Sequence, residues 1–186
     1  TQFPCLRLIL VGGERILGRD ILLAKNRFPT TVFSHFYSLT ESSVNTFAII
    51  DHSRRVESVT LGEPVPGVEI LLLDEEGEEV DEYQEGEIFI VCNHVAAGYW
   101  KNPGATSGAF LYDEDMGRIY RTGDLGKLNL DGSIEFTGRK DHQVKIRGFR
   151  VELTEIEQLL QSHDSVNETV VNSFDPGDGE TRLCAY

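Results

Sequence analysis

The sequence lacks the features that mark membrane proteins, disulfide-stapled proteins and nucleic-acid binders. It contains no apolar run of membrane-spanning length and no signal peptide. Its three cysteines, Cys5, Cys92 and Cys184, are odd in number and show no metal-ligand spacing, so we expect reduced thiols in a cytoplasmic protein. The 31 acidic residues outnumber the 17 basic ones, which gives a net charge of −14. So acidic a chain argues against nucleic acid and against an anionic membrane as partners.

The sequence motifs of covalent and metal-centred catalysis are missing as well. The five histidines fall in no ligand spacing, and neither a serine nucleophile elbow nor a cysteine–histidine pattern can be recognised. No P-loop or dinucleotide fingerprint is present. We therefore expect neither a protein nucleophile nor a histidine-bound metal.

Basic residues are unevenly distributed along the chain. None occurs between Arg55 and Lys101, while residues 74–87 hold nine carboxylates and are interpreted as a solvated hairpin tip. Residues 139–150 show the opposite bias, which predicts an anionic ligand. The five cationic side chains in this segment are Arg139, Lys140, Lys145, Arg147 and Arg150.

The first part of the chain carries the pattern of a β–α–β unit. Residues 5–11 form a nearly continuous apolar run before a glycine pair, as in a buried parallel strand. Residues 17–28 show helical spacing, and residues 30–38 are rich in β-branched and aromatic side chains. Ligands of open α/β sheets bind at the carboxyl ends of such strands, here residues 12–14 and 37–41.

The remaining chain is predicted to form a small antiparallel β-barrel and then a third, α+β unit of hairpin, helix and two strands. Short strands separated by turn signals suggest the barrel, at residues 68–73, 86–92, 118–120, 127–130 and 133–137. We thus expect an α/β plus β-rich protein. Its domains are residues 1–52 (partial α/β), 53–140 (barrel-like) and 141–186 (C-terminal subdomain).

The third unit opens with a basic hairpin. Gln143, Lys145 and Arg147 alternate with apolar residues, so we expect them to share one face of a strand that ends in a glycine turn. Thr154 and Glu157 then stand in the spacing of a capping box, which predicts the start of an amphipathic helix.

Tyr37, Thr40 and Glu41 share one loop after a predicted strand. An aromatic ring can stack on a base, a hydroxyl can donate to a phosphate and a carboxylate can hold Mg²⁺. The alternative is structural, with a packed tyrosine and a Thr-Glu pair that begins a helix. Gly12 and Gly13, at the end of the earlier strand, are equally compatible with a simple tight turn.

Asp124 belongs to a Tyr-Arg-Thr-Gly-Asp-Leu segment, residues 120–125, which we expect to end a strand in a turn. A carboxylate accepts two hydrogen bonds at once, as two vicinal ribose hydroxyls require. The alternative is an Asx-turn that holds the loop together. Phe136 is by the same reasoning either a core residue or a base-stacking one.

Five motifs, in the same order, resemble the AMP-forming adenylation superfamily and, within it, the adenylation domains of nonribosomal peptide synthetases. Two are the segment at 120–125 and residues 138–157, which include Asp-His-Gln-Val-Lys-Ile-Arg-Gly-Phe-Arg-Val-Glu. The others are Leu-Val-Gly-Gly-Glu at 10–14, Tyr-Ser-Leu-Thr-Glu at 37–41, and Gly-Glu-Ile-Phe-Ile-Val to Gly-Tyr-Trp at 86–100. The resemblance covers nearly the whole chain.

The resemblance implies a nucleotide site that binds ATP or AMP with Mg²⁺. Tyr37 is implied to stack on adenine, with Gly13 and Phe136 nearby, and Asp124 to bind the ribose hydroxyls. The implied catalytic residues are Thr40, which touches the phosphates, Glu41, which ligates Mg²⁺, and Lys145. Arg139 and Lys145 are implied to reach the ribose and phosphate region.

The resemblance also implies a hinge and part of a substrate pocket. Asp141 falls where a small C-terminal lid rotates between the two half-reactions. The pocket residues implied for the acyl substrate are Leu10, Gly12, Phe36, Val44 and Asn45.

The implied reaction joins a carboxylic acid to ATP as an acyl-adenylate, with release of pyrophosphate, and then transfers the acyl group to a phosphopantetheine thiol on a carrier-protein domain. The remainder of the parent adenylation domain is a further implied partner, because the phosphate loop and the lid lysine fall outside residues 1–186. Departures at His35, Ser38, Leu39 and Ala97 leave aryl, keto and fatty acids open beside an amino acid. A stand-alone acyl-CoA ligase and a non-catalytic fragment are the alternative functions.

Overall fold

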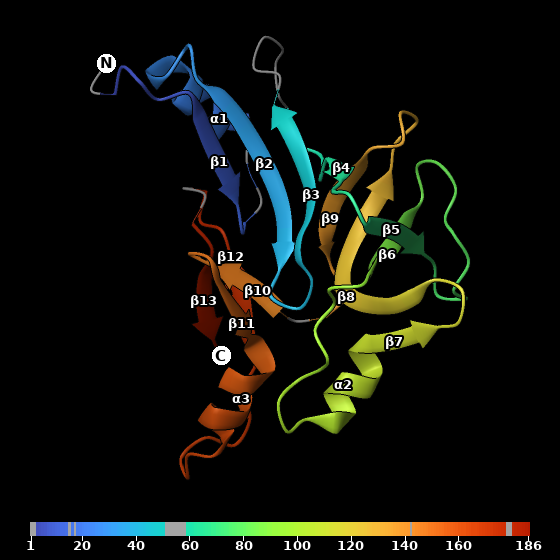
Figure 1. Cartoon of the computed structure of the whole chain (residues 1–186). Helices are drawn as coiled ribbons and strands as arrows, with labels where there is room; N and C mark the ends of the chain where they lie inside the picture. Colours follow the sequence, from blue (N-terminus) through green and yellow to red (C-terminus); the bar gives the residue numbers. More distant parts are fainter. Residues whose placement is uncertain (1–2, 15, 17, 51–58, 142, 178–179) are drawn as a thin grey trace. The chain divides into compact units, whose positions relative to one another are not determined.

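The computed structural model describes residues 3–14, 16, 18–50, 59–141, 143–177 and 180–186. The chain falls into two compact units, residues 1–138 and residues 139–186. Its fold is mixed α/β and rich in sheet, as the order of elements shows (Figure 1). Within the described part of the chain, no helix is both long and apolar enough to cross a membrane.

The β–α–β unit predicted for the start of the chain is confirmed. Strands β1 (Leu8–Gly12) and β2 (Val32–Leu39) pair in parallel, and helix α1 (Gly18–Arg27) connects them (Figure 1). Ile21 of α1 and Phe33 of β2 are buried against each other in a small core of their own. The apolar spacing that predicted the helix therefore marks the face by which it packs on the sheet.

A third strand, β3 (Ser43–Ile50), continues this sheet and was not expected from the sequence. It runs antiparallel to β2 after a tight turn, and the two-residue β4 (Glu63–Pro64) pairs with it. The Thr-Glu pair at the turn thus leads into a hairpin, so the alternative in which it begins a helix is wrong. The strand pattern is hard to read because the register shifts at Asn45, which breaks the alternation of period two.

The second sheet is antiparallel, but it does not close into the predicted barrel. Its strands are β5 (Val68–Leu73), β6 (Glu85–Cys92), β7 (Phe110–Asp113), β8 (Gly117–Leu128) and β9 (Ile134–Arg139). The strand order is β5-β6-β8-β7, and β9 also pairs with β8. Because β6 occupies one edge of β8 along most of its length, β7 and β9 share the other edge. No pairing among the described strands returns to β5, so the sheet stays open.

Strand β8 takes the place of two shorter predicted strands, residues 118–120 and 127–130. It continues through the segment expected to form a turn, because a bulge accommodates those residues within the sheet. Helix α2 (Pro103–Ala109), which precedes β7, was also not predicted. It contains two glycines and buries no side chain, so its sequence shows no apolar periodicity from which a helix could be predicted.

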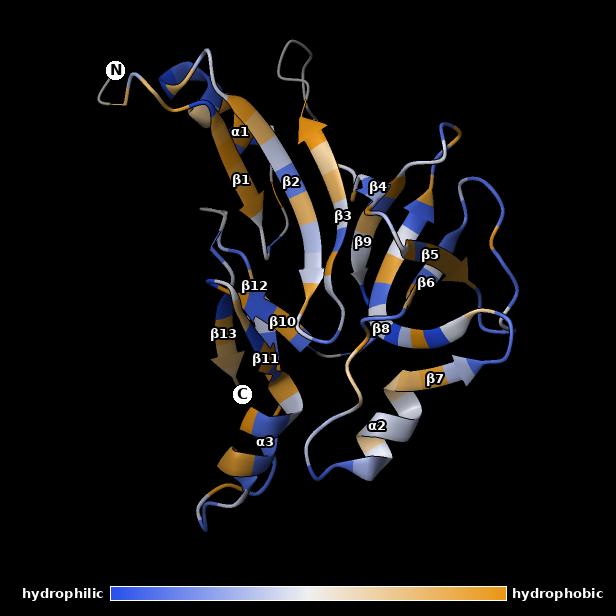
Figure 2. Cartoon of the chain, in the orientation of Figure 1, coloured by the Kyte–Doolittle hydropathy of each residue, from blue (hydrophilic) through white to orange (hydrophobic). Residues whose placement is uncertain are grey.

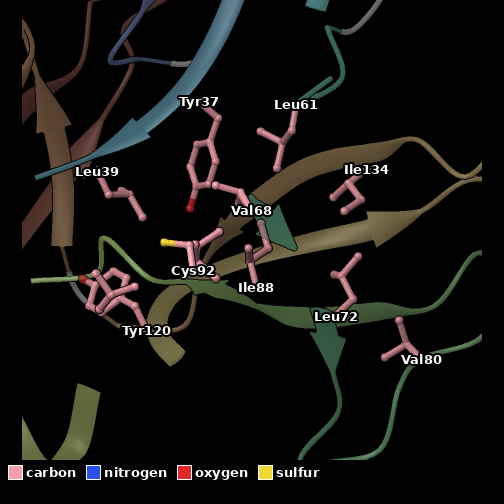
Figure 3. Packing of buried hydrophobic residues seen from close by; sticks show 12 residues of the cluster. Tyr37, Leu39, Leu61, Val68, Leu72, Val80, Ile88, Cys92, Tyr120 and Ile134 are labelled. Carbon is pink, nitrogen blue, oxygen red and sulfur yellow. The ribbon is translucent and has the colours of Figure 1, made fainter. Parts of the chain in front are cut away.

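The main hydrophobic core joins the two sheets of the first unit. Tyr37 and Leu39 reach into it from β2, while Ile88 and Tyr120 come from β6 and β8 (Figure 3). Leu61, from the segment before β4, completes the contact. The end of β2 is therefore fixed against the second sheet by buried side chains.

The second unit contains the predicted hairpin, helix and two further strands. The hairpin strands pair antiparallel, as do the last two strands. The elements are β10 (Gln143–Ile146), β11 (Phe149–Glu152), α3 (Leu153–Gln161), β12 (Val171–Phe174) and β13 (Arg182–Ala185).

The hairpin turn corrects the predicted position of Arg147. Arg147 and Gly148 both have positive φ, 51° and 81°, and Ile146 pairs with Phe149 across them. Two positive φ values in a two-residue loop are typical of a type I′ turn. Arg147 therefore lies in the turn and not on the strand face that carries Gln143 and Lys145.

The predicted capping box at the start of α3 is wrong. The N-cap residue is Glu152, and its side chain makes no capping hydrogen bond. Glu157 instead accepts a hydrogen bond at 2.8 Å from the backbone N–H of Val171, which ties α3 to β12. The Glu157 carboxylate, which the capping-box spacing assigned to the start of the helix, therefore makes a tertiary contact instead.

The three-part division into residues 1–52, 53–140 and 141–186 stays a prediction. Its first boundary falls within residues 51–58, which lie outside the described residues. Its second boundary falls close to the one between the two compact units, after residue 138.

Two isoleucines test where the core lies. Ile88 is fully buried in the main core, whereas Ile49 on β3 is 71% exposed. Ile88→Ala is expected to lower the free energy of unfolding by about 2–5 kcal/mol, because it leaves a cavity. Ile49→Ala, the matched control, is expected to cost less than about 1 kcal/mol. Urea unfolding followed by circular dichroism measures both, and equal losses contradict this assignment of the core.

Candidate functional site

The candidate site is centred on a hydrogen bond between two residues that are far apart in the sequence. The Tyr37 hydroxyl donates to Oδ2 of Asp124 at 2.5 Å. Tyr37 is 6% exposed and Asp124 is 1% exposed, so the bond lies in the interior of the first unit. The structure therefore brings the proposed adenine residue and the proposed ribose residue together.

A bulge in β8 positions Asp124. The register between β6 and β8 shifts so that residues 122–124 lie opposite Ile88, and Gly123 takes a φ of 72°. The Thr122 hydroxyl donates to the Ile88 carbonyl at 2.7 Å and accepts from the Asp124 backbone N–H at 2.9 Å. Residues 120–125 thus lie within a strand, whereas the sequence had predicted that they end one. Thr122 makes the local bonds, while the Asp124 carboxylate meets Tyr37.

An ion pair beside the bulge was not predicted from the sequence. Arg121 donates through two nitrogens to the two carboxylate oxygens of Glu87, each at 2.8 Å. Glu87 is 5% exposed, so this bidentate pair compensates a buried carboxylate. The pair links the two strands diagonally, since Arg121 lies opposite Phe89 and Glu87 opposite Leu125. The acidic run at 74–87 is therefore not solvated throughout, because its last member is an interior residue.

Thr40 and Glu41 occupy the turn between β2 and β3. Thr40 is exposed, as a phosphate-binding hydroxyl requires, whereas Glu41 is 7% exposed. Oε1 of Glu41 accepts a hydrogen bond from the Tyr99 hydroxyl at 2.8 Å, and the Glu41 carbonyl accepts from the Ala96 backbone N–H at 2.7 Å. Tyr99 belongs to the Gly-Tyr-Trp motif, for which no chemical role was predicted, and only the structure shows its contact with Glu41.

Four of the five predicted pocket residues share one face of the first sheet. Gly12 lies opposite Phe36, and Leu10 and Val44 fall on the same face by register. Leu10 is 54% exposed and Val44 is 39% exposed, and β1 is predominantly apolar (Figure 2). A Cβ on Gly12 would approach the Phe36 ring to 2.8 Å, so a glycine is needed for this contact.

The fifth pocket residue, Asn45, has a different environment. It is the extra residue at the register shift and is fully buried, and neither its Nδ2 nor its Oδ1 has a hydrogen-bond partner among the described residues. A buried amide without partners costs on the order of 1–3 kcal/mol and needs a compensating group. Asn45 therefore does not lie on the exposed apolar face with the other four.

Gly13 and Phe136 occupy the surroundings of the site in different ways. Gly13 has a φ of 88°, and a Cβ there would meet no atom of the described part of the chain within 4 Å, so its glycine is explained by the backbone conformation. Phe136, on β9, is half-buried and packs against the main core. This packing is the core role that the sequence left open beside base stacking.

Two predicted site residues of the second unit, Arg139 and Asp141, are joined in a polar chain. Arg139 donates to both carboxylate oxygens of Asp141, at 2.7 Å from Nε and 2.6 Å from Nη2. Burial alone raises the pKa of Asp141, but the Arg139 guanidinium and the Gln143 backbone N–H together hold that pKa below its ordinary value. The proposed hinge residue is thus an ionised partner in an ion pair.

The hairpin extends this chain. Arg150 donates to Oε1 of Gln143 at 2.6 Å, and the Gln143 amide donates to Glu152. Burial, followed by the negative charge of Asp141, raises the pKa of Glu152. Lys145 lies opposite Arg150 in the hairpin and is half-buried.

Metal-ligand chemistry is limited in the part of the chain that the structure describes. No group of three or more histidine, cysteine or acidic side chains there is placed to hold a metal ion. Mg²⁺, however, often binds through one or two carboxylates and completes its shell with phosphate oxygens and water. The single carboxylate of Glu41, beside the exposed Thr40, fits this mode of binding and no all-protein cage.

Comparison with known proteins identifies the family. A family model described as AMP-binding enzyme matches residues 1–100. The chain is 37% identical over 185 residues to bacitracin synthase 1 of Bacillus licheniformis, covering 97% of this chain and 4% of that protein. It is 40% identical over 185 residues to surfactin synthase subunit 1 of Bacillus subtilis (strain 168), covering 97% of this chain and 5% of that protein.

Solved structures agree with this match. PA1221, described as an NRPS protein containing adenylation and PCP domains, superposes with a TM-score of 0.84 and 27% identity. That match covers 98% of this chain and 38% of PA1221, and IdnL1 matches with a TM-score of 0.86, 28% identity and coverage of 96% and 37%. The chain belongs to the AMP-binding enzyme family, and it spans less than two fifths of the length of these solved relatives.

The Arg139–Asp141 pair gives a pH-dependent prediction. Arg139→Gln is expected to raise the pKa of Asp141, because it removes the charge that opposes the effect of burial. A carboxylate whose pKa is lower in the folded state stabilises the fold at pH values above its unfolded-state pKa. This contribution is lost as the pH falls through the folded-state pKa. The stability lost in the variant should therefore be largest near neutral pH and shrink in acid.

Carboxyl-detected NMR titration of Asp141 measures the shift directly. Arg147→Gln is the matched control, since Arg147 makes an exposed pair with Glu180 at 3.2 Å. The control should leave the pKa of Asp141 unchanged. An Asp141 pKa that does not move in Arg139→Gln contradicts the assignment.

Proposed function

We propose that this chain is part of an adenylation enzyme that activates a carboxylic acid, here an amino acid, with ATP. The carboxylate oxygen attacks the α-phosphorus, the bond to the bridging oxygen of pyrophosphate breaks, and acyl-adenylate and pyrophosphate result. The acyl group then passes to the phosphopantetheine thiol of a carrier-protein domain, with AMP as the leaving group. The observation that carries the proposal is the Tyr37–Asp124 hydrogen bond, found in a chain of the AMP-binding enzyme family.

The nature of the relatives supports an amino acid and a carrier partner. One relative, at 36% identity over 194 residues, is a dimodular nonribosomal peptide synthase of Bacillus subtilis (strain 168), and the match covers 100% of this chain and 8% of that protein. PA1221 contains both an adenylation and a PCP domain. We extend these properties to the complete protein that carries this sequence.

In this proposal the nucleotide binds at the carboxyl end of β2. Tyr37 contacts the adenine, with Gly13 and Phe136 beside it, and Asp124 accepts the ribose hydroxyls. Because the Tyr37 hydroxyl already fixes one oxygen of Asp124, the carboxylate is held in one orientation before the nucleotide arrives. Such pre-organisation lowers the cost of ordering the site on binding.

Thr40 and Glu41 serve the phosphate end of the nucleotide. The exposed Thr40 hydroxyl donates to a phosphate oxygen, and Glu41 holds Mg²⁺. When bound, Mg²⁺ neutralises charge that develops on the phosphate oxygens. From the second unit, Arg139 and Lys145 supply positive charge for the ribose and phosphates. Positioning and charge neutralisation then provide the catalysis, with no protein nucleophile.

The acyl substrate is proposed to lie over the apolar face of the first sheet. Its described wall consists of Leu10, Gly12, Phe36 and Val44, and Asn45 is the buried extra residue at the register shift. Asp141 is the proposed hinge of a C-terminal lid. The remainder of the parent adenylation domain is expected to supply the other walls of the pocket.

AMP binding tests the nucleotide site. The 186-residue chain is expected to bind AMP weakly, and Asp124→Ala should weaken that binding about tenfold or more, since each hydrogen bond to a charged group contributes about 1.5–3 kcal/mol. Asp115→Ala, at an exposed position on the β7–β8 turn, is the control and should bind like the wild type. Isothermal titration calorimetry makes the comparison, with circular dichroism to confirm folding.

If the wild type and a folded Asp124→Ala variant bind AMP equally well, Asp124 does not bind the ribose.

The acyl step is tested on the complete protein by pyrophosphate exchange with amino acids and fatty acids. If the acyl group is transferred only to coenzyme A, the alternative function of an acyl-CoA ligase replaces the proposed one. Acyl-adenylate formation by residues 1–186 alone contradicts the dependence on the remainder of the domain.

A further inference from the structure

The Glu41 carboxylate is held in the interior by a tyrosine from a distant segment. Glu41 is 7% exposed, and a buried carboxylate is unfavourable by several kcal/mol unless hydrogen bonds compensate it. The Tyr99 hydroxyl supplies one such bond to Oε1 at 2.8 Å. The same segment donates a second bond to Glu41, from the Ala96 N–H to the Glu41 carbonyl at 2.7 Å. Side chain and backbone of Glu41 are thus both fixed by residues 96–99.

Tyr99 is itself held at both ends. Its backbone N–H donates to the Thr106 hydroxyl at 2.9 Å, which anchors the loop to helix α2. Its ring packs edge-on against Phe110, with centroids 5.0 Å apart and an interplanar angle of 74°. Aromatic pairs in this geometry contribute about 0.5–1.5 kcal/mol beyond the area they bury. The phenol is therefore fixed in place relative to Glu41.

Tyr120, a buried tyrosine of β8, continues the chain of hydroxyl groups from the half-buried Tyr99. Tyr120 is 1% exposed, its hydroxyl lies 3.2 Å from that of Tyr99, and its ring packs on Phe110 at 5.1 Å. A carboxylate can only accept, so the single hydroxyl proton of Tyr99 goes to Glu41. Tyr120 must then donate to the Tyr99 oxygen. Such a chain of hydrogen bonds strengthens each member by polarisation.

Tyr99 and Tyr120 link Glu41 to β8, the strand that also carries Asp124. Tyr120 stands on β8, which also carries Asp124 at the bulge. Glu41 follows β2, which carries Tyr37. The ribose carboxylate is therefore tied to β2 by Tyr37, and the metal carboxylate is tied to β8 by way of Tyr99 and Tyr120.

We infer that Tyr99 and Tyr120 are positioning residues that hold the Glu41 carboxylate in the orientation that binds Mg²⁺ together with the nucleotide. This inference rests on the proposed function, in which Glu41 is the metal-binding carboxylate. Mg²⁺ demands near-ideal octahedral geometry, so a ligand oxygen held in advance binds more tightly than one that must be ordered. Groups that hydrogen-bond a metal ligand typically change metal affinity about 10–100-fold when removed.

Metal binding by the complete protein that carries this sequence tests the inference. Mn²⁺ is the probe, and electron paramagnetic resonance measures free Mn²⁺ in the presence of a saturating non-hydrolysable ATP analogue. Tyr99→Phe removes one oxygen atom and should weaken Mn²⁺ binding about tenfold. Tyr120→Phe retains the Tyr99–Glu41 bond and should weaken it about two- to fourfold, because only the polarising bond is lost. Nucleotide affinity without metal should stay within about twofold of the wild type in both variants.

A third tyrosine provides the matched control. Tyr112 is 75% exposed on β7, and Tyr112→Phe should leave Mn²⁺ affinity and melting temperature unchanged. A merely structural role of Tyr99 predicts a lower melting temperature with wild-type Mn²⁺ affinity in the folded variant, and that result overturns the inference. If Tyr99→Phe does not fold, wild-type Mn²⁺ affinity in Tyr120→Phe overturns it equally.

The outcome for Glu41 separates the inference from the proposed function. In the wild type the nucleotide analogue should tighten Mn²⁺ binding, and Glu41→Gln should abolish that effect. Loss of the effect in Glu41→Gln with no change in the tyrosine variants overturns the inference alone. Mn²⁺ binding that is insensitive to Glu41→Gln contradicts the metal role of Glu41 and the inference with it.

Discussion

The hydrogen bond between Tyr37 and Asp124 is the interaction on which the candidate site depends. It links the end of β2 to the bulge of β8, across the main core of the first unit. Neither partner could be placed without the rest of the fold. Tyr37 is held by the parallel sheet, and Asp124 is turned toward it because Thr122 bonds to Ile88 and takes up the extra residues of the bulge. A buried carboxylate needs a hydrogen-bond donor to be stable, and the Tyr37 hydroxyl is a donor to Asp124, so the bond constrains fold and chemistry together.

The same principle recurs at other acidic side chains of this protein. Glu41 is bound by Tyr99, and Glu87 by a bidentate contact from Arg121. In the second unit Asp141 is bound by Arg139. These three carboxylates and that of Asp124 thus each have a defined donor, although the chain as a whole carries a large excess of negative charge. Fixed carboxylates are suited to gripping hydroxyl groups and Mg²⁺, which is what the proposed adenylation chemistry requires.

The sequence predicted those parts of the fold that have a strong local pattern. The apolar run of β1, the alternation of β10 and the turn at Gly148 all appear where they were expected. It failed where tertiary contacts override local pattern. The register shift at Asn45 breaks the alternating pattern of β3, so this strand was not predicted. The bulge allows β8 to continue as one strand where two were predicted. Glu157 bonds to β12 and caps no helix.

The candidate site shows the same division. Motif resemblance named Tyr37 and Asp124, but their direct contact depends on pairing across 87 residues. Tyr99 could not be identified from the sequence, because its role arises from where α2 and Phe110 place its hydroxyl. Its position in the Gly-Tyr-Trp motif was the only available signal.

The most direct test of this account is a double-mutant cycle on Tyr37→Phe and Asp124→Ala, with the free energy of unfolding measured in urea. A hydrogen bond to a buried carboxylate predicts a coupling energy of about 1–3 kcal/mol between the two substitutions. Losses that add to within about 0.5 kcal/mol would mean that the two residues do not interact. That result would contradict the central claim, that this bond joins the end of β2 to the bulge of β8 at the site proposed for the nucleotide.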